Sequence, residues 1–285
     1  MIRTFGNVTI ILILAAAFFG SIISGVFLTA VEIVSFEHFY IEFGDPPVLN
    51  ATSWVVFDAA TGKIFASYNS DEQVSIASIT KLPAAAVLYE QHDIWATTTI
   101  SASDVAAEGR AGRLEIGQEY SLHTLLFPLL LESSNDAAAV FERVEDTLVD
   151  TMNVYAQSLE LKHTSFSDSS GLSNNNLSTA RELATLSRAI YDTNRYIFDI
   201  TSLKSYLGTI NGWMNNNPFI YESGYIGGKH GYTPQARSTA IAFFDERLLG
   251  TQKSQSVGYV LLGSTDLMSD MAQLREYVQT HVRLK

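Results

Sequence analysis

Short runs of apolar residues predict five β-strands, which fall into two groups along the chain. The β-branched and aromatic runs at residues 53–59 and 63–68 are separated by A-T-G, which is typical of a hairpin. Three further runs of this kind occupy residues 225–229, 238–244 and 257–263. The pattern therefore predicts a hairpin near the start of the globular part and three more strands near its end.

The sequence between these two groups has the spacing of helices. A helix is expected to begin near Ser78, where Ala and Leu become frequent, and Pro83 should make its first turn irregular. Helical sequence continues over roughly residues 101–195, with polar interruptions. After the last strand, one face of an amphipathic helix carries four apolar residues: Leu267, Met271, Leu274 and Val278. The predicted order is two strands, a helical block, three strands and a helix.

Residues 4–31 are uncharged and largely apolar. This stretch is longer than the roughly 20 residues that cross a bilayer, whereas a cleaved signal peptide has an apolar core of about 7 to 15 residues. Arg3 precedes the stretch and Glu32 follows it, which favours a cytoplasmic N-terminus. We therefore expect residues 1–36 to be a transmembrane signal-anchor and residues 37–52 to be a linker. A cleaved signal peptide and a buried soluble helix are the alternatives.

Composition excludes several classes of function. The 285-residue chain can bury a full hydrophobic core, but it has no cysteine for a thiol nucleophile or a disulfide. Its six histidines are scattered without an H-E-x-x-H pair, so we expect neither a catalytic metal nor another cofactor. The net charge of −12 disfavours nucleic acid as a partner.

Ser78 and Lys81 belong to the run S-I-T-K. Residues three apart share a helix face, so the lysine amine could act as the base that activates the serine hydroxyl. The amine would first have to lose its proton, and its free pKa is about 10.4. Burial and a second positive charge, which Lys229 could supply, would both lower that value. A serine followed three places later by a lysine is also expected about once by chance in such a chain.

Ser133 and Asn135 lie in the run S-S-N. The hydroxyl could relay a proton to a leaving amine, and the carboxamide could hold a substrate backbone group. Ser-Ser-Asn-Asp would serve equally well as the cap of a helix.

Lys229 is the single charge in the run G-G-K-H-G. Glycines allow a substrate backbone to approach closely, and the lysine could bind a carboxylate. A phosphate-binding loop does not fit, because Ser223 stands at its first glycine and His230 at its hydroxyl residue. A lysine that protects a strand edge from aggregation is the remaining alternative.

Taken in order, the three runs resemble the S-x-x-K, S-x-N and K-T-G motifs of the penicillin-binding-protein and serine β-lactamase superfamily. Within it, the chain looks most like the serine D-alanyl-D-alanine carboxypeptidases of the low-molecular-mass penicillin-binding proteins. The sequence segments that resemble this family include A-S-I-T-K-L, L-L-L-E-S-S-N-D-A-A, T-S-F-S-D-S-S-G-L and G-G-K-H-G-Y-T-P-Q-A. The resemblance implies an α+β fold for residues 53–285. This fold has a five-stranded antiparallel sheet, helices on both faces and an all-helical subdomain over roughly residues 101–195.

The resemblance also implies a role for each motif residue. Ser78 would be the acylated nucleophile, Lys81 its general base, and Ser133 the group that passes a proton to the departing D-alanine. Asn135 would orient the peptide stem. Lys229 would bind the terminal carboxylate of the substrate and help to lower the pKa of Lys81.

The residues that follow Lys229 would complete the site. His230, Gly231, Tyr232 and Thr233 would contact the substrate, and the backbone N–H groups of Ser78 and Tyr232 would form the oxyanion hole. The implied partners are peptidoglycan peptides ending in D-Ala-D-Ala, with β-lactams as inhibitors. The membrane would be contacted through the N-terminal segment, with the catalytic domain outside the cell membrane.

The chain departs from the family pattern at His230, where the third motif normally has Thr or Ser. An imidazole could also donate to the substrate carboxylate, more strongly when protonated. Because the reference pKa of histidine is about 6.5, we expect the pH profiles of the wild type and His230→Thr to differ between pH 5 and 8.

Three other activities share most of these residues. A β-lactamase of the commonest class would need E-x-x-L-N, which is absent between Asn135 and Lys229. A D,D-endopeptidase would use the same residues as a carboxypeptidase. A non-catalytic peptidoglycan-binding homologue would be compatible with the altered third motif.

Overall fold

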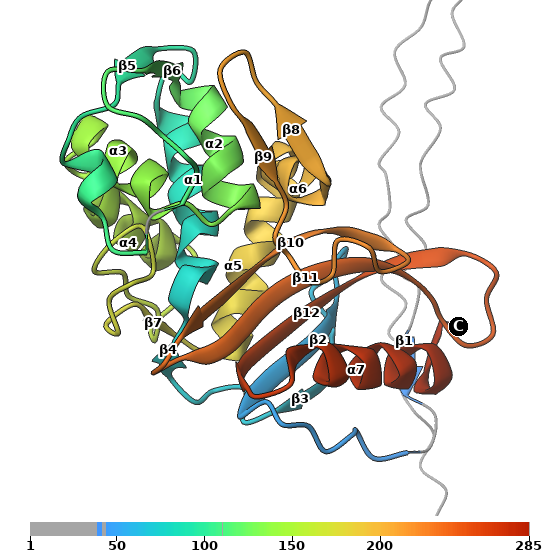
Figure 1. The fold of residues 1–285 in the computed structure, drawn as a ribbon. Helices are drawn as coiled ribbons and strands as arrows, with labels where there is room; N and C mark the ends of the chain where they lie inside the picture. The colour runs from blue at the N-terminus through green and yellow to red at the C-terminus, as the bar shows by residue number, and fades with distance from the viewer. Residues whose placement is uncertain (1–38, 42–43, 110, 285) are drawn as a thin grey trace, which may run out of the picture. The chain divides into compact units, whose positions relative to one another are not determined.

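A five-stranded antiparallel sheet in the order β10-β11-β12-β2-β3 forms the centre of the fold (Figure 1). The structure is a computed structural model and describes residues 39–41, 44–109 and 111–284. The strands of the sheet are β2 (Ser53–Asp58), β3 (Ile64–Tyr68), β10 (Tyr225–Thr233), β11 (Arg237–Arg247) and β12 (Ser254–Ser264). They confirm the five predicted strands. The strand β10 runs four residues further than predicted, from His230 through Gly231 to Thr233.

The two faces of the sheet bury two separate cores, because successive side chains of a strand point in opposite directions. Trp54 and Val56 point to the face that is covered by α7 (Leu267–His281). Val55 and Phe57 point to the opposite face, which packs against α5 (Ala180–Thr193) and α1 (Lys81–Gln91). Full burial of each such side chain contributes about 1.5–3 kcal/mol. Figure 1 shows α7 and α5 on opposite sides of the strands.

The last helix confirms the predicted amphipathic pattern. Met271, Leu274 and Val278 are buried against the sheet, and Leu267 packs against the same core while partly exposed. The side chain of Asp266 caps the helix by accepting a hydrogen bond from the backbone N–H of Ser269, at 3.2 Å.

The helical part lies beyond the α1 face of the sheet (Figure 1). Its other helices are α2 (Leu122–Leu131), α3 (Asn135–Val144), α4 (Leu148–Ser158) and α6 (Arg195–Ser202). Three two-stranded ribbons accompany them: β4 (Val74–Ser75) with β7 (Leu177–Ser178), β5 (Thr97–Thr99) with β6 (Glu119–Ser121), and β8 (Ser205–Leu207) with β9 (Gly212–Met214). The region that was predicted as helical thus also contains short strands.

The start of α1 has the predicted irregular turn. A 3-10 helix, η1 (Ala77–Thr80), precedes α1, which begins at Lys81. Pro83 consequently lies in the first turn of the α-helix, where its missing N–H group has no intrahelical partner to lose. Ser78 therefore lies in the 3-10 helix, and Lys81 is the first residue of the α-helix.

The segment predicted as a linker, residues 37–52, contains a strand and contacts the rest of the domain. Within residues 37–52, β1 (Phe39–Ile41) pairs with β13 (Val282–Leu284), and the backbone N–H of Asn50 donates to Asp270 at 2.8 Å. A strand of three residues is defined only by its partner, which lies more than 200 positions away in the sequence. The predicted transmembrane segment, residues 1–36, lies outside the described residues. Over the ranges that the structure does describe, no helix combines the length and the apolar character needed to span a bilayer.

Candidate active site

The structure brings Ser78, Lys81 and Asn135 together. The side-chain nitrogen Nζ of Lys81 donates to Ser78 Oγ at 3.3 Å and to Asn135 Oδ1 at 2.8 Å. Its third hydrogen bond goes to the backbone carbonyl of Ser170. The lysine is fully buried, whereas Ser78 remains partly exposed. A base and a partly accessible hydroxyl are therefore in hydrogen-bond contact, as acyl transfer requires.

Burial changes the acid–base properties of both lysines in the site. It lowers the pKa of Lys81 to about 7, although the charge of Asp168 acts in the opposite direction. Burial also lowers the pKa of Lys229 well below its usual range, and the charge of Lys81 lowers it further. Repulsion between the two amines disfavours the state in which both are charged. Burial is thus the main cause at Lys81, where the sequence had suggested the charge of Lys229 as a contributor.

The backbone of β10 runs directly beside the amide of Ser78. A Cβ atom added to Gly231 would lie 2.6 Å from the backbone nitrogen of Ser78, so only glycine permits this approach. Ala77, which precedes the serine, has a left-handed φ of 50°. The predicted oxyanion hole pairs the N–H of Ser78 with that of Tyr232, the residue after Gly231. This close approach is compatible with that pairing.

A tight loop at residues 168–173 supports the site from behind. The Asp168 carboxylate accepts hydrogen bonds from the backbone N–H groups of Ser170 at 2.8 Å, Gly171 at 2.5 Å and Ser173 at 2.7 Å. A Cβ atom on Gly171 would collide with the carbonyl oxygen of Ala77 at 2.1 Å. The loop therefore fixes both the carbonyl of Ser170 that receives Lys81 and the backbone next to Ser78.

The sequence interpretation assigned no role to this loop. Burial opposes ionisation of Asp168, but the hydrogen bonds from Ser173, Ser170 and Gly171 hold its pKa below the usual value. An aspartate followed by serines and a glycine is a signature of a side-chain-capped turn, and this signal could have identified the loop.

Replacing Asp168 by asparagine should shift the pH dependence of activity. The variant keeps one acceptor oxygen but loses the negative charge that raises the pKa of Lys81. The pKa of Lys81 should then fall below about 7, so the acidic limb of the kcat/KM profile should move to lower pH. Rates measured from pH 5 to 9 with a D-Ala-D-Ala peptide test this. Thermal unfolding of the same variant reports any loss of the loop, and an unmoved limb in a folded variant would contradict the prediction.

The S-S-N run serves both as a helix cap and as part of the site. Ser134 caps α3, because its Oγ accepts from Ala137 N at 3.0 Å, while it donates to the carbonyl of Ala111 at 2.5 Å. Asn135 donates to the carbonyl of Glu108 at 2.7 Å and accepts from Lys81. The helix-cap reading therefore holds for Ser134, whereas Asn135 contacts Lys81 and its role toward the substrate stays a prediction.

Ser133 has an unusual backbone conformation. Its φ is 59°, which costs a non-glycine residue on the order of 1–3 kcal/mol. Within the part of the chain that the structure describes, its hydroxyl is not hydrogen-bonded to Ser78 or Lys81. The role of Ser133 as a proton relay thus stays a prediction. A strained, partly exposed residue next to Ser134 and Asn135 is compatible with it.

The third motif lies on the edge strand β10. The side chain of Lys229 is 1% exposed, and its Nζ donates to the carbonyl of His230 at 2.6 Å. Thr201 accepts from the N–H of Gly228 at 2.9 Å, which ties this strand to α6. Thr233 accepts from Ala236 N at 3.0 Å, so its hydroxyl already stabilises the turn between β10 and β11.

The expected protonation of His230 between pH 5 and 8 is wrong. Burial, with a further contribution from the charge of Lys229, lowers the pKa of His230 to about 3. Its Nδ1 is buried and has no hydrogen-bond partner among the described residues. The imidazole is therefore neutral at physiological pH. The sequence could not show this, because burial depends on the packing around β10.

The pH profiles of the wild type and His230→Thr should consequently have the same shape between pH 5 and 8. The substitution can change the height of the profile, since it replaces an imidazole by a hydroxyl beside Lys229. It should add or remove no ionisation in this range, because the pKa of His230 is about 3. Steady-state rates of both proteins over this range test the prediction. A limb near pH 6.5 that disappears in His230→Thr would contradict it.

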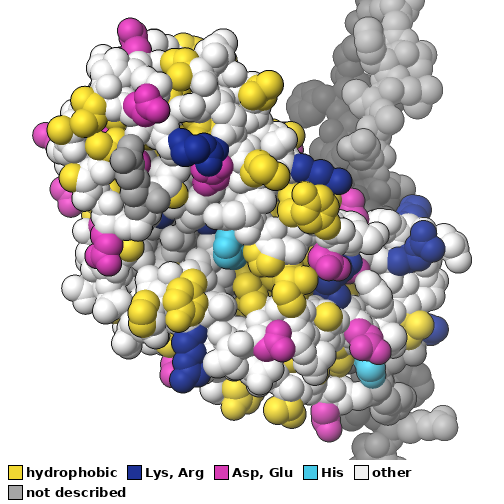
Figure 2. Space-filling model, viewed as in Figure 1, with side chains coloured by type: hydrophobic (Ala, Val, Ile, Leu, Met, Phe, Trp, Pro, Cys, Tyr) yellow, Lys and Arg dark blue, Asp and Glu magenta, His cyan; other side chains and the backbone are white. Residues whose placement is uncertain are grey.

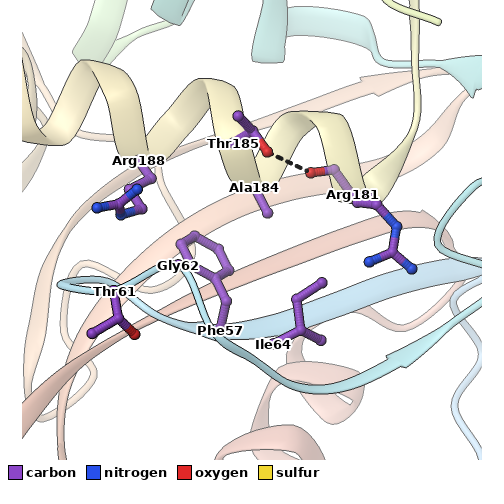
Figure 3. A pocket seen from close by; sticks show the side chains of 8 residues that line it. All are labelled: Phe57, Thr61, Gly62, Ile64, Arg181, Ala184, Thr185 and Arg188. Carbon is purple, nitrogen blue, oxygen red and sulfur yellow. Dashed lines mark hydrogen bonds between the residues drawn. The ribbon is translucent and has the colours of Figure 1, made fainter. Parts of the chain in front are cut away.

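A separate cavity of about 190 Å³ lies between the β2–β3 hairpin and α5 (Figure 3). Phe57 and Ile64 form its apolar wall, and Arg181 and Arg188 flank it. Both arginines are already engaged, Arg181 with Asp71 at 2.7 Å and Arg188 with the carbonyl of Ala59 at 3.1 Å. None of the predicted site residues lines this cavity.

The exposed surface around the helical part and the sheet is mixed in charge. Figure 2 shows a hollow between these two parts, with basic and acidic side chains scattered over the same face. Across the described residues, no group of three or more His, Asp or Glu side chains is arranged to hold a metal ion.

The model of the peptidase S11 family, described as D-alanyl-D-alanine carboxypeptidase, matches residues 42–247. The chain belongs to this family. The match confirms the resemblance that the three motifs suggested, and the S11 assignment covers all three of them.

Members of the S11 family with curated names are similar over most of the globular part. DacD, a D-alanyl-D-alanine carboxypeptidase of Escherichia coli, is 31% identical over 220 residues, which cover 69% of this chain and 55% of that protein. DacB2 of Mycobacterium tuberculosis is 31% identical over 202 residues, covering 67% and 69% respectively. A D-alanyl-D-alanine endopeptidase of Pseudomonas aeruginosa is 35% identical over 144 residues, covering 48% and 46%. The chain thus spans about half the length of DacD.

Solved structures confirm the α+β fold with its five-stranded antiparallel sheet. A D-alanyl-D-alanine carboxypeptidase from Mycobacterium tuberculosis H37Rv has a TM-score of 0.73 and 25% identity, with 84% of this chain and 93% of that chain covered. The Streptomyces K15 DD-transpeptidase has a TM-score of 0.74 and 24% identity, with 82% and 98% covered. The second similarity concerns the fold alone.

Proposed function

We propose that this protein is a serine-type D-Ala-D-Ala carboxypeptidase that acts on peptidoglycan stem peptides through an acyl-enzyme. The observation that carries the proposal is the buried Lys81 amine, which lies 3.3 Å from Ser78 Oγ and has its pKa lowered to about 7. A base whose pKa is close to the working pH is the most effective proton acceptor. Membership in the S11 family supports the substrate class.

Acylation begins when neutral Lys81 accepts the proton of the Ser78 hydroxyl. The serine oxygen then forms a bond to the carbonyl carbon of the penultimate D-alanine. Negative charge develops on the carbonyl oxygen, where the N–H groups of Ser78 and Tyr232 would receive it. One such donor is typically worth about a hundredfold to a thousandfold in rate.

The C–N bond to the terminal D-alanine breaks in the next step. Its nitrogen takes up, through Ser133, the proton that Lys81 accepted, so free D-alanine leaves the ester on Ser78 and Lys81 is neutral again. Water then attacks the ester carbonyl while Lys81 accepts a proton from it, which releases the shortened peptide and restores the serine hydroxyl. The base therefore acts in both halves of the reaction.

Lys229 would hold the terminal carboxylate of the substrate. A buried amine without a counter-charge binds protons weakly, as the lowered pKa of Lys229 indicates. An incoming carboxylate would favour the charged form and gain a charge-assisted hydrogen bond. β-Lactams would enter the same site, acylate Ser78 and act as inhibitors.

Mass spectrometry of muropeptides tests this function directly. The full-length chain in detergent would be incubated with purified monomeric and cross-linked muropeptides. We expect monomers ending in D-Ala-D-Ala to lose one alanine. Unchanged monomers and dimers would overturn the proposal and favour a non-catalytic wall-binding protein.

Endopeptidase activity is a second candidate, because the Pseudomonas aeruginosa relative carries that name. Hydrolysis of a cross-link and release of a terminal D-alanine use the same acyl-enzyme chemistry. In the same experiment, splitting of dimers into monomers would demonstrate this activity.

We propose that the enzyme acts outside the cell membrane, with residues 1–36 as its anchor. The proposal is supported by the uncharged apolar run in the sequence, which is long enough to cross a bilayer. Protease treatment of intact cells and of lysed cells, followed by detection of the C-terminal domain, tests it. Digestion of the domain in lysed cells but not in intact cells would contradict an extracytoplasmic location.

A further inference from the structure

Three segments of the chain meet at the carboxylate of Glu132. Its Oε1 accepts a hydrogen bond from the Arg113 guanidinium at 2.7 Å and another from the backbone N–H of Met214 at 3.1 Å. Arg113 also donates to the carbonyl of Gly212. The carboxylate side chain is only 13% exposed, whereas that of Arg113 is 58% exposed. Glu132 therefore joins the loop before β6, the end of α2 and strand β9.

Further hydrogen bonds strengthen this junction. The backbone N–H of Asn216 donates to the carbonyl of Leu131 at 2.9 Å, and its side chain donates to the carbonyl of Glu132 at 3.1 Å. The indole N–H of Trp213 donates to the carbonyl of Gly112 at 2.6 Å. The backbone at Leu131 and Glu132 is thereby held by a segment about 80 positions away.

Ser133 comes directly after this junction and is held on its other side as well. The N–H groups of Glu132 and Ser134 both donate to the carbonyl of Pro128, at 3.2 and 3.0 Å. Ser133 lies between these two tethered residues with a φ of 59°. A non-glycine residue keeps such a conformation only where its surroundings over-determine it. The direction of the Ser133 side chain thus depends on the contacts of its neighbours.

We propose that Glu132, fixed by Arg113, is a positioning residue that aims the Ser133 hydroxyl at the leaving nitrogen of the substrate. The inference rests on the proposed function and adds residues that the three motifs do not contain. Arginine–carboxylate contacts are short, charge-assisted and directional, which suits them to hold a strained turn. Loss of the contact would leave the nucleophile and its base in place, because among the described residues neither Ser78 nor Lys81 is hydrogen-bonded to this junction.

Two substrates with different leaving groups distinguish a positioning role of Glu132 from a general structural role. An amide nitrogen must be protonated before it departs, whereas a thiolate departs without a proton. Two substrates with the same acyl part are therefore compared, an N-acylated D-Ala-D-Ala peptide and its thioester analogue with sulfur at the scissile position. For Glu132→Ala we expect kcat/KM on the amide to fall roughly tenfold to a hundredfold. On the thioester we expect a change of less than about threefold, because no general acid is needed there.

Two variants control for charge and for folding. Glu132→Gln retains an acceptor for the Met214 N–H, so it should restore most of the amide activity. Asp71→Ala removes a similarly short arginine contact, 2.7 Å from Arg181, and should leave both substrates unaffected. If Glu132→Ala does not fold, Arg113→Gln carries the same comparison.

The outcomes are distinguishable. A selective loss on the amide supports the positioning role. Equal losses on both substrates, or no loss on either, would overturn it while leaving the proposed function intact. A wild-type protein that turns over neither substrate would overturn the proposed function, and the positioning role with it.

Discussion

Ser78→Ala should lose all covalent labelling by penicillin and all release of D-alanine. The substitution removes the one oxygen that would form the ester, while the partly exposed position tolerates the smaller side chain. Intact-protein mass spectrometry after incubation with penicillin measures the adduct directly. We expect a stoichiometric mass increase for the wild type and none for the variant.

Ser75→Ala is a matched control for this experiment. Its hydroxyl is buried three residues before Ser78 and has no hydrogen-bond partner in the described part of the chain, so its removal should cost little. Labelling of Ser75→Ala should equal that of the wild type. An adduct on Ser78→Ala would contradict the assigned nucleophile. A wild type that is never labelled would favour the binding protein, and one that turns penicillin over rapidly would favour a β-lactamase.

Lys81→Met should slow acylation of Ser78 by about 10²–10⁴-fold, the range typical of a general base. Methionine has a similar length and no amine, so the base is removed with little change in volume. In the wild type, the uncharged amine is the active form. Acylation should therefore increase as the pH rises through about 7 and then level off. The variant should lack this limb.

Stopped-flow measurement of penicillin acylation from pH 5 to 9 tests both statements. Thermal unfolding of Lys81→Met checks that the variant folds, since the change leaves Asn135 Oδ1 and the carbonyl of Ser170 without their donor. Lys253→Met, at an exposed lysine between β11 and β12, serves as the control and should acylate normally. Acylation of Lys81→Met at the wild-type rate would show that another group is the base.

Much of the fold could be predicted because its signals are local. The β-branched and aromatic runs at residues 53–59 and 238–244 indicated strands, and both strands occur in the central sheet. The apolar stripe of the last helix indicated the face that packs against that sheet. The short strand β1 could not be predicted, because three residues form a strand only when a distant segment supplies the partner.

The site, like the fold, could be predicted only in part. Ser78 and Lys81 are three positions apart, so helical geometry alone places them together, and the structure confirms their contact. The loop at Asp168 and the junction at Glu132 were missed because their residues act through segments that are distant in the sequence. Their importance comes from contacts with Lys81 and with the backbone around Ser133.

The sequence by itself determined the family, the order of the five sheet strands and the last helix, and the residues to which the catalytic roles are proposed. These properties depend on residue identity and on spacing over a few positions. Only the tertiary structure decided the protonation states and the close approaches. Burial lowers the pKa of Lys81 to about 7 and that of His230 to about 3. Gly231 reaches the amide of Ser78 from more than 150 positions away. Desolvation and close packing arise from segments that are distant along the chain, so no local pattern encodes them.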